Sequence, residues 1–254
     1  MNFDVPINEL LTIMLGAVRA GAWLAICPPF QSRLIPRQVK VLLSIGITLP
    51  MAPYLRGSLP SLETPDLIAC AALQVFVGAS LGFITALLFA AIQAAGDLID
   101  VFGGFTLAAA FDPLSMNQSS IFGRFYNLTA ATLLFASDGH QLILRGFMQS
   151  YKALPLNANI SMETLSRLLI TGIAEMFLAA LQIAGPLIAV LFLTDVAFGL
   201  LNRVAPALNA FQLGFPAKIL LVLTLAGTAV TMLPRALDGL IDKAVSAVVS
   251  LTGG

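Results

Sequence analysis

Long apolar segments alternate with short polar links along most of this chain. Alanine and leucine dominate the apolar segments, which favours helix over strand. The third segment, residues 67–96, contains no charged residue. At about 1.5 Å per residue, a helix of that length more than covers a hydrocarbon core of roughly 30 Å. The pattern predicts an all-α, membrane-associated protein with apolar segments at approximately residues 10–30, 39–55, 67–96, 125–136, 168–201 and 207–234.

Proline residues and short length make several of these segments unsuitable as simple membrane spans. We expect Pro50 and Pro53 to end the second segment and Pro186 to interrupt the fifth, because proline cannot donate the backbone hydrogen bond that a helix interior needs. The fourth segment is too short to cross a bilayer. We therefore predict helical hairpins with broken and re-entrant helices, shielded by partner subunits, in one domain that covers residues 1–254.

Charges and helix-breaking residues gather in residues 194–218, between two apolar segments. In hydrocarbon every freed backbone group and every ion needs a partner, so a lipid-facing helix does not explain this composition. Two interpretations follow: a substrate site inside the membrane, or a surface that packs against protein neighbours. The residues concerned are Asp195, Gly199, Arg203, Pro206, Asn209, Gly214, Pro216 and Lys218.

A second unusual tract, residues 97–124, predicts a helix end followed by a long loop. Gly103 and Gly104 permit backbone angles that other residues avoid. Further along, Pro113 biases Asp112 away from the helical region. An apolar loop of this kind survives in a membrane protein only when protein buries it or when it lines a pathway.

Bulky apolar side chains are spread through the same tract. In one interpretation they are core residues, since aromatic side chains usually bury a large area. In the other they form a gate, in which apolar side chains on a flexible loop close a pore by excluding water. The side chains are Phe102, Phe105, Phe111, Met116 and Phe122.

The composition supports a membrane location and narrows the possible functions. Hydrophobic residues make up 58% of the 254 residues and charged residues 10%, against about 25% charged residues in soluble domains. The mean hydropathy is +0.93. Thirteen basic and thirteen acidic residues leave no net charge, so no basic field is present to attract nucleic acid. We expect an integral membrane protein that does not bind nucleic acid.

The residues that enzymes and metal sites need are scarce. Cys27 and Cys70 lie in separate apolar runs without a CxxC spacing, and His140 is the single histidine, so no metal-ligand pattern can be recognised. The sequence also lacks the glycine-rich nucleotide-binding motifs. We expect no enzymatic activity, no metal and no cofactor, and we interpret both cysteines as buried free thiols.

Three charged residues inside apolar segments require partners. Arg19 lies in the first segment, and a structural ion pair or a backbone tether is favoured over a direct role in transport. Glu175 and Asp195 are expected to mark the ends of the fifth segment or to bind a partner chain, although a proton-coupled transporter would place carboxylates similarly. The expected partners of Arg19 are Glu175, Asp97, Asp100 or a group on another subunit.

Three segments of the chain together resemble the FliR family, the single-copy component of the flagellar type III export gate. They read RAGAWLAICPPFQSRLIPRQVK at residues 19–40, GFTLAAAFDPLSMNQ at residues 104–118, and GLLNRVAP followed by NAFQLGFPAK within residues 194–218. Injectisome relatives share this pattern, whereas SDGHQLILRGFMQSYKALP at residues 137–155 is similar to the flagellar branch in particular. The resemblance extends over roughly residues 10–245.

The resemblance implies a subunit of the export gate in the bacterial inner membrane, at the flagellar basal body. It implies assembly with FliP, FliQ and FlhB, and contact with FlhA, into the helical entry portal of a channel for unfolded export substrates. Energy would come from other parts of the apparatus. The alternative from another class is a stand-alone secondary transporter of a small solute, which would require inverted repeats that the sequence does not show.

The resemblance also implies roles for individual residues. The loop is expected to act as a channel plug that limits leakage when nothing is exported, through Gly104, Phe105, Phe111, Asp112, Pro113, Met116 and Gln118. Subunit packing and assembly are expected to involve Arg19, Gly199, Arg203, Pro206, Asn209, Phe211, Gly214, Pro216 and Lys218.

Overall fold

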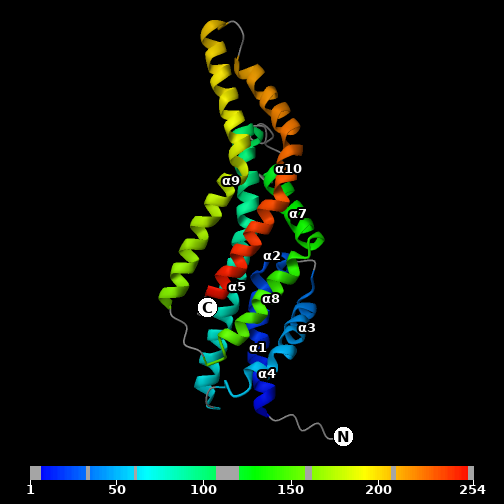
Figure 1. Cartoon of the computed structure of the whole chain (residues 1–254), viewed down its shortest axis with the longest axis vertical. Coiled ribbons are helices and arrows are strands. Elements are labelled where there is room, and N and C mark those ends of the chain that lie inside the picture. Colours follow the sequence, from blue (N-terminus) through cyan, green and yellow to red (C-terminus); the bar gives the residue numbers. More distant parts are fainter. Residues whose placement is uncertain are drawn as a thin grey trace. The chain divides into compact units, whose positions relative to one another are not determined.

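The computed structural model describes residues 7–32, 35–59, 62–106, 120–157, 162–206 and 210–250, which are mostly helical (Figure 1). No strand occurs within these ranges, so the prediction of an all-α fold is confirmed. In chain order the elements are α1 (Ile7–Ile26), α2 (Pro28–Gln31), α3 (Arg37–Thr48), the 3-10 helix η1 (Leu49–Met51), α4 (Ala52–Leu55), α5 (Thr64–Gly103), α7 (Ile121–Ala136), α8 (Gly139–Ala153), α9 (Met162–Val204) and α10 (Ala210–Ser250).

Helices of membrane-spanning length and composition match the predicted apolar segments. Among the described residues, four stretches are long and apolar enough to cross a membrane: Ile7–Ile26, Arg37–Leu55, Thr64–Gly103 and Ser166–Val204. A fifth candidate within α10 consists of two pieces that meet at an angle of 56°. This bent pair agrees with the prediction of broken helices, and α7, with 16 residues, is too short to span, as expected.

Proline has different effects in the second and fifth segments. Regular α3 ends at Thr48, and Pro50 and Pro53 lie in the short helical turns η1 and α4 that follow, as predicted. The expected interruption at Pro186 is wrong, because α9 continues through that residue. Gly185 precedes it and has no Cβ, which removes part of the steric conflict between a proline ring and the residue before it.

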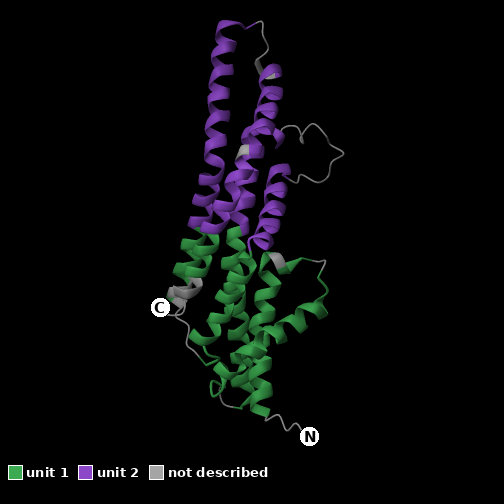
Figure 2. Cartoon of the chain, turned by 45° about the vertical axis from the view of Figure 1, so that its right-hand side comes forward, with its two compact units in different colours: residues 1–88, 138–173, 240–254 green, residues 89–137, 174–239 purple. Residues whose placement is uncertain are grey.

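The chain divides into two compact units, and unit 1 comprises residues 1–88, 138–173 and 240–254 (Figure 2). It contains α1, α3, α4 and α8 together with one end each of α5, α9 and α10. In its core the Trp23 ring stacks on Phe147 with centroids 4.4 Å apart, and Phe147 meets Tyr151 edge-on at 5.4 Å. Aromatic packing between α1 and α8 thus organises this unit.

Unit 2 comprises residues 89–137 and 174–239. It contains α7 and the remaining parts of α5, α9 and α10. Its buried side chains include Ile92 and Ile99 on α5, Tyr126 and Leu134 on α7, and Val222 on α10. Because three helices continue from one unit into the other, neither unit is a separate stretch of chain. The expectation of one domain over residues 1–254 stays a prediction.

Candidate functional site at the ends of the loop

The structure describes the two ends of the predicted plug loop. Gly104 and Phe105 lie within the described residues, at the end of α5. Ser120 and α7 follow on the other side. The other predicted plug residues, Phe111, Asp112, Pro113, Met116 and Gln118, lie outside the described residues. The described part of the candidate site therefore consists of the residues that hold the two ends of the loop.

The first end of the loop is the Gly-Gly break. Helix α5 ends at Gly103, and Gly104 adopts a φ of +84°, a conformation that residues with a side chain rarely adopt. The helix end that the sequence predicted at this position is confirmed. Directly after it, the ring of Phe105 meets Phe122 edge-on, with centroids 5.2 Å apart. The first aromatic residue of the loop is thus packed against the first turn of α7.

The second end of the loop is held by a buried carboxylate. Asp100, 1% exposed, accepts a hydrogen bond from the Ser120 hydroxyl and one of 2.9 Å from the Phe122 backbone N–H. Ser120 is the N-cap of α7, and its Oγ accepts from the Gly123 N–H at 2.8 Å. An anion at a helix N-terminus binds unpaired N–H groups and the positive end of the helix dipole. Asp100 therefore joins the last turns of α5 to the first turn of α7.

Two glycines allow α5 and α7 to approach this closely. A Cβ at Gly96 would lie 2.5 Å from backbone atoms of Phe122. A Cβ on Gly123 would collide with the carboxylate of Asp97. Because backbone atoms cannot give way easily, a side chain at position 96 would push the two helices apart. A side chain at position 123 would displace the Asp97 carboxylate.

The charged tract at residues 194–218 includes the end of α9 and the start of α10. Lys218 on α10 forms an ion pair with Asp195 on α9. The Lys218 Nζ also donates a hydrogen bond of 3.4 Å to the carbonyl oxygen of Phe102, in the last turn of α5. We expected Asp195 to mark a helix end or to bind a partner chain, whereas its partner in the structure lies within the chain.

Side chains on one face of α10 lie against the Gly-Gly break. The Phe215 ring lies 3.1 Å from the position of a Cβ on Gly104, and a Val222 methyl lies 2.9 Å from that of a Cβ on Gly103. Phe215, Lys218 and Val222 are spaced three and four residues apart, which places them on the same side of a helix. The start of the predicted plug loop is therefore packed against α10.

The other predicted assembly residues lie mostly on the surface of the chain. Gly214 is buried, and a Cβ there would lie 3.4 Å from the Phe198 ring, so it permits close packing of α9 and α10. Asn209 and the side chain of Phe211 lie outside the described residues. The exposed members of the set are Gly199, Arg203, Pro206 and Pro216.

Arg19 is a structural tether in unit 1. It is 0% exposed, and its guanidinium donates to Gln74 Oε1 at 2.7 Å and to the carbonyl oxygens of Ser150 at 3.1 Å and Leu154 at 2.8 Å. The expectation of a carboxylate partner is wrong within the described residues, because neutral oxygens at the end of α8 take that place. The backbone tether was the right interpretation, since the last carbonyls of a helix lack internal donors.

Tyr151 completes the surroundings of Arg19. Its ring lies 4.8 Å from the guanidinium carbon, close enough for a cation-π contact. Burial raises the pKa of the Tyr151 hydroxyl, which therefore stays protonated and donates to the carbonyl oxygen of Gly16 at 2.8 Å. The sequence contained a signal for this site, an arginine inside an apolar segment, but no signal for its partners on α5 and α8.

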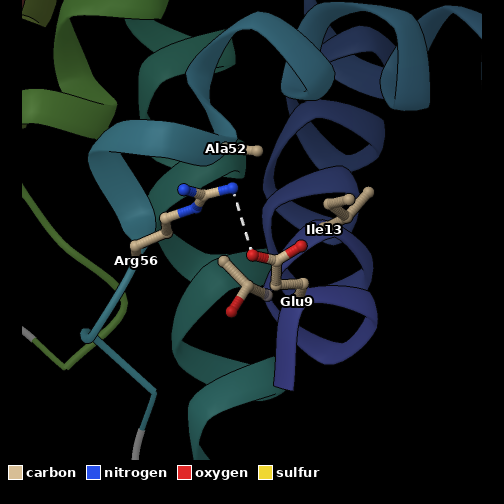
Figure 3. A pocket seen from close by; sticks show the side chains of 5 residues that line it. Glu9, Ile13, Ala52 and Arg56 are labelled. Carbon is tan, nitrogen blue, oxygen red and sulfur yellow. Dashed lines mark ion pairs between the residues drawn. The ribbon is translucent and has the colours of Figure 1, made fainter. Parts of the chain in front are cut away.

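A small surface pocket lies between α1 and α4 (Figure 3). Glu9, Thr12, Ile13, Ala52 and Arg56 line it. Glu9 and Arg56 form an ion pair of 3.1 Å with side chains that are largely exposed. Exposed ion pairs of this kind contribute little to the stability of the fold. We assign no function to this pocket.

Thiols and metal-binding side chains form no site in the described part of the chain. Cys27 and Cys70 are both buried, as the sequence predicted. Within the described residues no group of three or more histidine, cysteine, aspartate or glutamate side chains is placed to hold a metal ion. The buried polar contacts in the described residues are therefore found mainly at the ends of the loop and around Arg19.

Helices of spanning length, a broken helix and polar contacts that join helices within the chain define an all-α membrane protein. Over residues 10–244 the sequence matches the family described as Bacterial export proteins, family 1. It is 33% identical to flagellar biosynthetic protein FliR of Pectobacterium carotovorum subsp. carotovorum, over 85% of this chain and 83% of that protein. The chain belongs to the FliR family and is a component of a flagellar or type III export apparatus.

Two further relatives represent both branches of the family. Flagellar biosynthetic protein FliR of Bacillus subtilis (strain 168) is 30% identical, over 81% of this chain and 81% of that protein. Surface presentation of antigens protein SpaR of Shigella sonnei is 32% identical, over 59% of this chain and 58% of that protein. The flagellar relatives match over the larger share of the chain.

Proposed function

We propose that this chain forms part of the flagellar export channel in the bacterial inner membrane, at the flagellar basal body. In this proposal it assembles with FliP, FliQ and FlhB, contacts FlhA, and passes unfolded flagellar substrates without catalysing a reaction. Membership of the FliR family and the flagellar names of its relatives support this assignment.

The exposed end of the α9 and α10 hairpin supports packing against other subunits. Val204 at the end of α9 is 84% exposed, and Leu200 and Leu213 are also exposed. Arg203 lies among them and is exposed as well. A cation beside apolar side chains is costly in lipid and favourable when a protein neighbour supplies acceptors. We infer that this end binds partner subunits.

The observation that carries the plug proposal is the anchoring of the loop at both ends. Asp100 connects the end of α5 to the start of α7, so residues 104–119 leave and return at the same place on the unit. A loop held in this way can enter a pore while the helices stay fixed. Its apolar residues, Phe105 among them, suit a closure that excludes water.

Deletion of residues 104–119, or their replacement by a short Gly-Ser linker, tests the plug. Cells that carry the variant should leak ions or small solutes through an otherwise intact gate. Co-purification of the variant with FliP and FliQ serves as the control for assembly. Unchanged permeability in cells with a fully assembled variant gate would refute the plug.

The stand-alone transporter is not favoured. Its support came from Asp195 and the helix breakers near it, and Asp195 is already paired with Lys218 inside the chain. The discriminating experiment is uptake by vesicles that contain the purified chain alone, where movement of a small solute would favour the transporter.

A further inference from the structure

Helix α3 of unit 1 buries its polar side chains and exposes its apolar ones. It packs against α1 (Figure 1), and its buried residues are Ser44 and Thr48. Both face α1, because a Cβ on Gly16 would lie 2.5 Å from a Thr48 methyl and one on Gly21 would lie 4.0 Å from the Ser44 Cβ. The exposed apolar residues of α3 and η1 are Val39, Val41, Leu42, Leu43, Ile45 and Leu49. A continuous apolar surface of this kind marks a contact with protein or with lipid.

The stretch Arg37–Leu55, which contains α3, is the least buried of the four candidate spans in the described residues. Only 17% of its most apolar window is buried, against 28% to 61% in the other three. Its 19 residues cover about 28 Å at about 1.5 Å per residue, close to the thickness of a hydrocarbon core. The exposed face of this stretch therefore matches a bilayer in both length and polarity.

Both ends of the stretch carry residues that favour the membrane–water interface. At its start Arg37 is exposed and Lys40 is half-buried, and no acidic residue occurs in residues 31–40. At its other end Tyr54 is 55% exposed, and the Lys152 ammonium lies 4.5 Å from the centre of its ring. Tyrosine rings and long cationic side chains anchor spans at the level of the headgroups.

The composition of this face favours lipid over a neighbouring subunit. Its exposed apolar residues are all aliphatic, and leucine, isoleucine and valine are the residues that enter hydrocarbon most readily. The centres of protein interfaces are instead enriched in aromatic residues, methionine and arginine. The end of the α9 and α10 hairpin is different, because Arg203 lies among its exposed apolar side chains.

We propose that the outer face of α3 binds anionic phospholipids. The acyl chains lie along Leu42, Ile45 and Leu49, which are spaced three and four residues apart and share one side of the helix. The phosphates bind Arg37 and Lys40, since cations beside a span attract anionic headgroups. The inference goes beyond the proposed function, because it concerns the lipid neighbours of the chain, and its failure would leave the plug proposal intact.

A nitroxide spin label at position 42 tests the contact with acyl chains. The test uses the assembled gate, purified with its partner subunits and reconstituted in vesicles of phosphatidylglycerol and phosphatidylcholine. Leu42→Cys replaces a side chain that is 69% exposed, and Cys27 and Cys70 are buried, so the label attaches at position 42. Collisions with oxygen, which dissolves in lipid, should be frequent, and collisions with a water-soluble nickel chelate should be rare.

Two outcomes of the spin-label experiment would overturn the proposal. Rare collisions with both reagents would mean that a neighbouring subunit covers α3, and frequent collisions with the nickel chelate would mean that α3 faces water. Ser44→Cys, at a position that faces α1, supplies the reference values for a site covered by protein. If the Leu42→Cys gate does not assemble, Leu49→Cys on the same side of the helix replaces it.

Photoactivatable phospholipids test the charge of the headgroup. In the same vesicles, photoactivatable phosphatidylglycerol should label the α3 peptide more than photoactivatable phosphatidylcholine does. Arg37→Gln combined with Lys40→Gln should lower this labelling ratio by about fivefold or more, because each cation near an anionic surface contributes about a factor of five. The matched control, Arg145→Gln with Arg235→Gln, removes two exposed cations from other helices and should leave the ratio unchanged. An unchanged ratio in the α3 variant, or an equal fall in the control, would overturn the binding of anionic lipid at α3.

Discussion

Asp100 near the end of α5 accepts a hydrogen bond of 2.9 Å from the backbone N–H of Phe122 at the start of α7. The two residues lie on opposite sides of the loop at residues 104–119 and tie its ends together. The two helices that flank the proposed plug are therefore joined directly to each other.

Removal of the Asp100 carboxylate should weaken that base. Asp100→Ala leaves the Phe122 N–H and the Ser120 hydroxyl without their acceptor, which costs about 1–3 kcal/mol for each buried group left unpaired. We expect a lower unfolding temperature of the purified complex and faster proteolysis at the loop. Asn127→Ala removes an exposed hydrogen bond from α7 and is the matched control. Equal stability of the two variants would contradict the role of Asp100.

Substitution of Arg19 should destabilise unit 1. Arg19→Met leaves acceptors on α5 and α8 without a donor inside the protein, at a cost of about 3 kcal/mol. Lys should not rescue the loss, because one ammonium cannot reproduce the planar fork that reaches separate oxygens. The measurement is the amount of folded chain in membranes and its unfolding temperature. Arg145→Met, at an exposed position on α8, should be close to wild type.

The same variant distinguishes a structural role from a role in transport. An Arg19→Met protein that accumulates and assembles normally but does not export would assign the residue to transport. Because Arg19 donates hydrogen bonds to Ser150 and Leu154, we expect instead that the Arg19→Met protein fails to fold and therefore accumulates poorly.

Arg203 is predicted to act in assembly. Arg203→Met removes an exposed cation from the end of α9. If a partner subunit buries this group in an ion pair, its loss should weaken the complex by roughly 3 kcal/mol. The measurement is co-purification with FliP and FliQ, with Arg235→Met as control. If the variant assembles fully but does not export, Arg203 acts in transport and not in assembly.

The sequence predicted the elements of this protein better than the contacts between them. Apolar length and proline positions identified most helices, and the Gly-Gly pair identified the end of α5. These features are local, so the chain itself reveals them. The exception was Pro186, through which α9 continues.

The partners of charged residues could not be predicted, because they depend on which helix faces meet. Arg19 was expected to seek a carboxylate, yet the end of α8 offers carbonyl oxygens that serve equally well. Asp195 and Lys218 were both singled out in the charged tract but were not expected to pair, and the fold brings them together. They lie on different helices, so no helical repeat could have paired them. Such pairings follow from the packing of α9 against α10.

The most direct test of the plug is the conductance of the purified export gate in a planar lipid bilayer, with the loop intact and with residues 104–119 replaced by a short Gly-Ser linker. Both gates must contain the same partner subunits in the same proportions. We predict that the intact gate is closed to K⁺ in the absence of substrate and that the loop-replaced gate conducts continuously. Equal, low conductance of the two gates would contradict it.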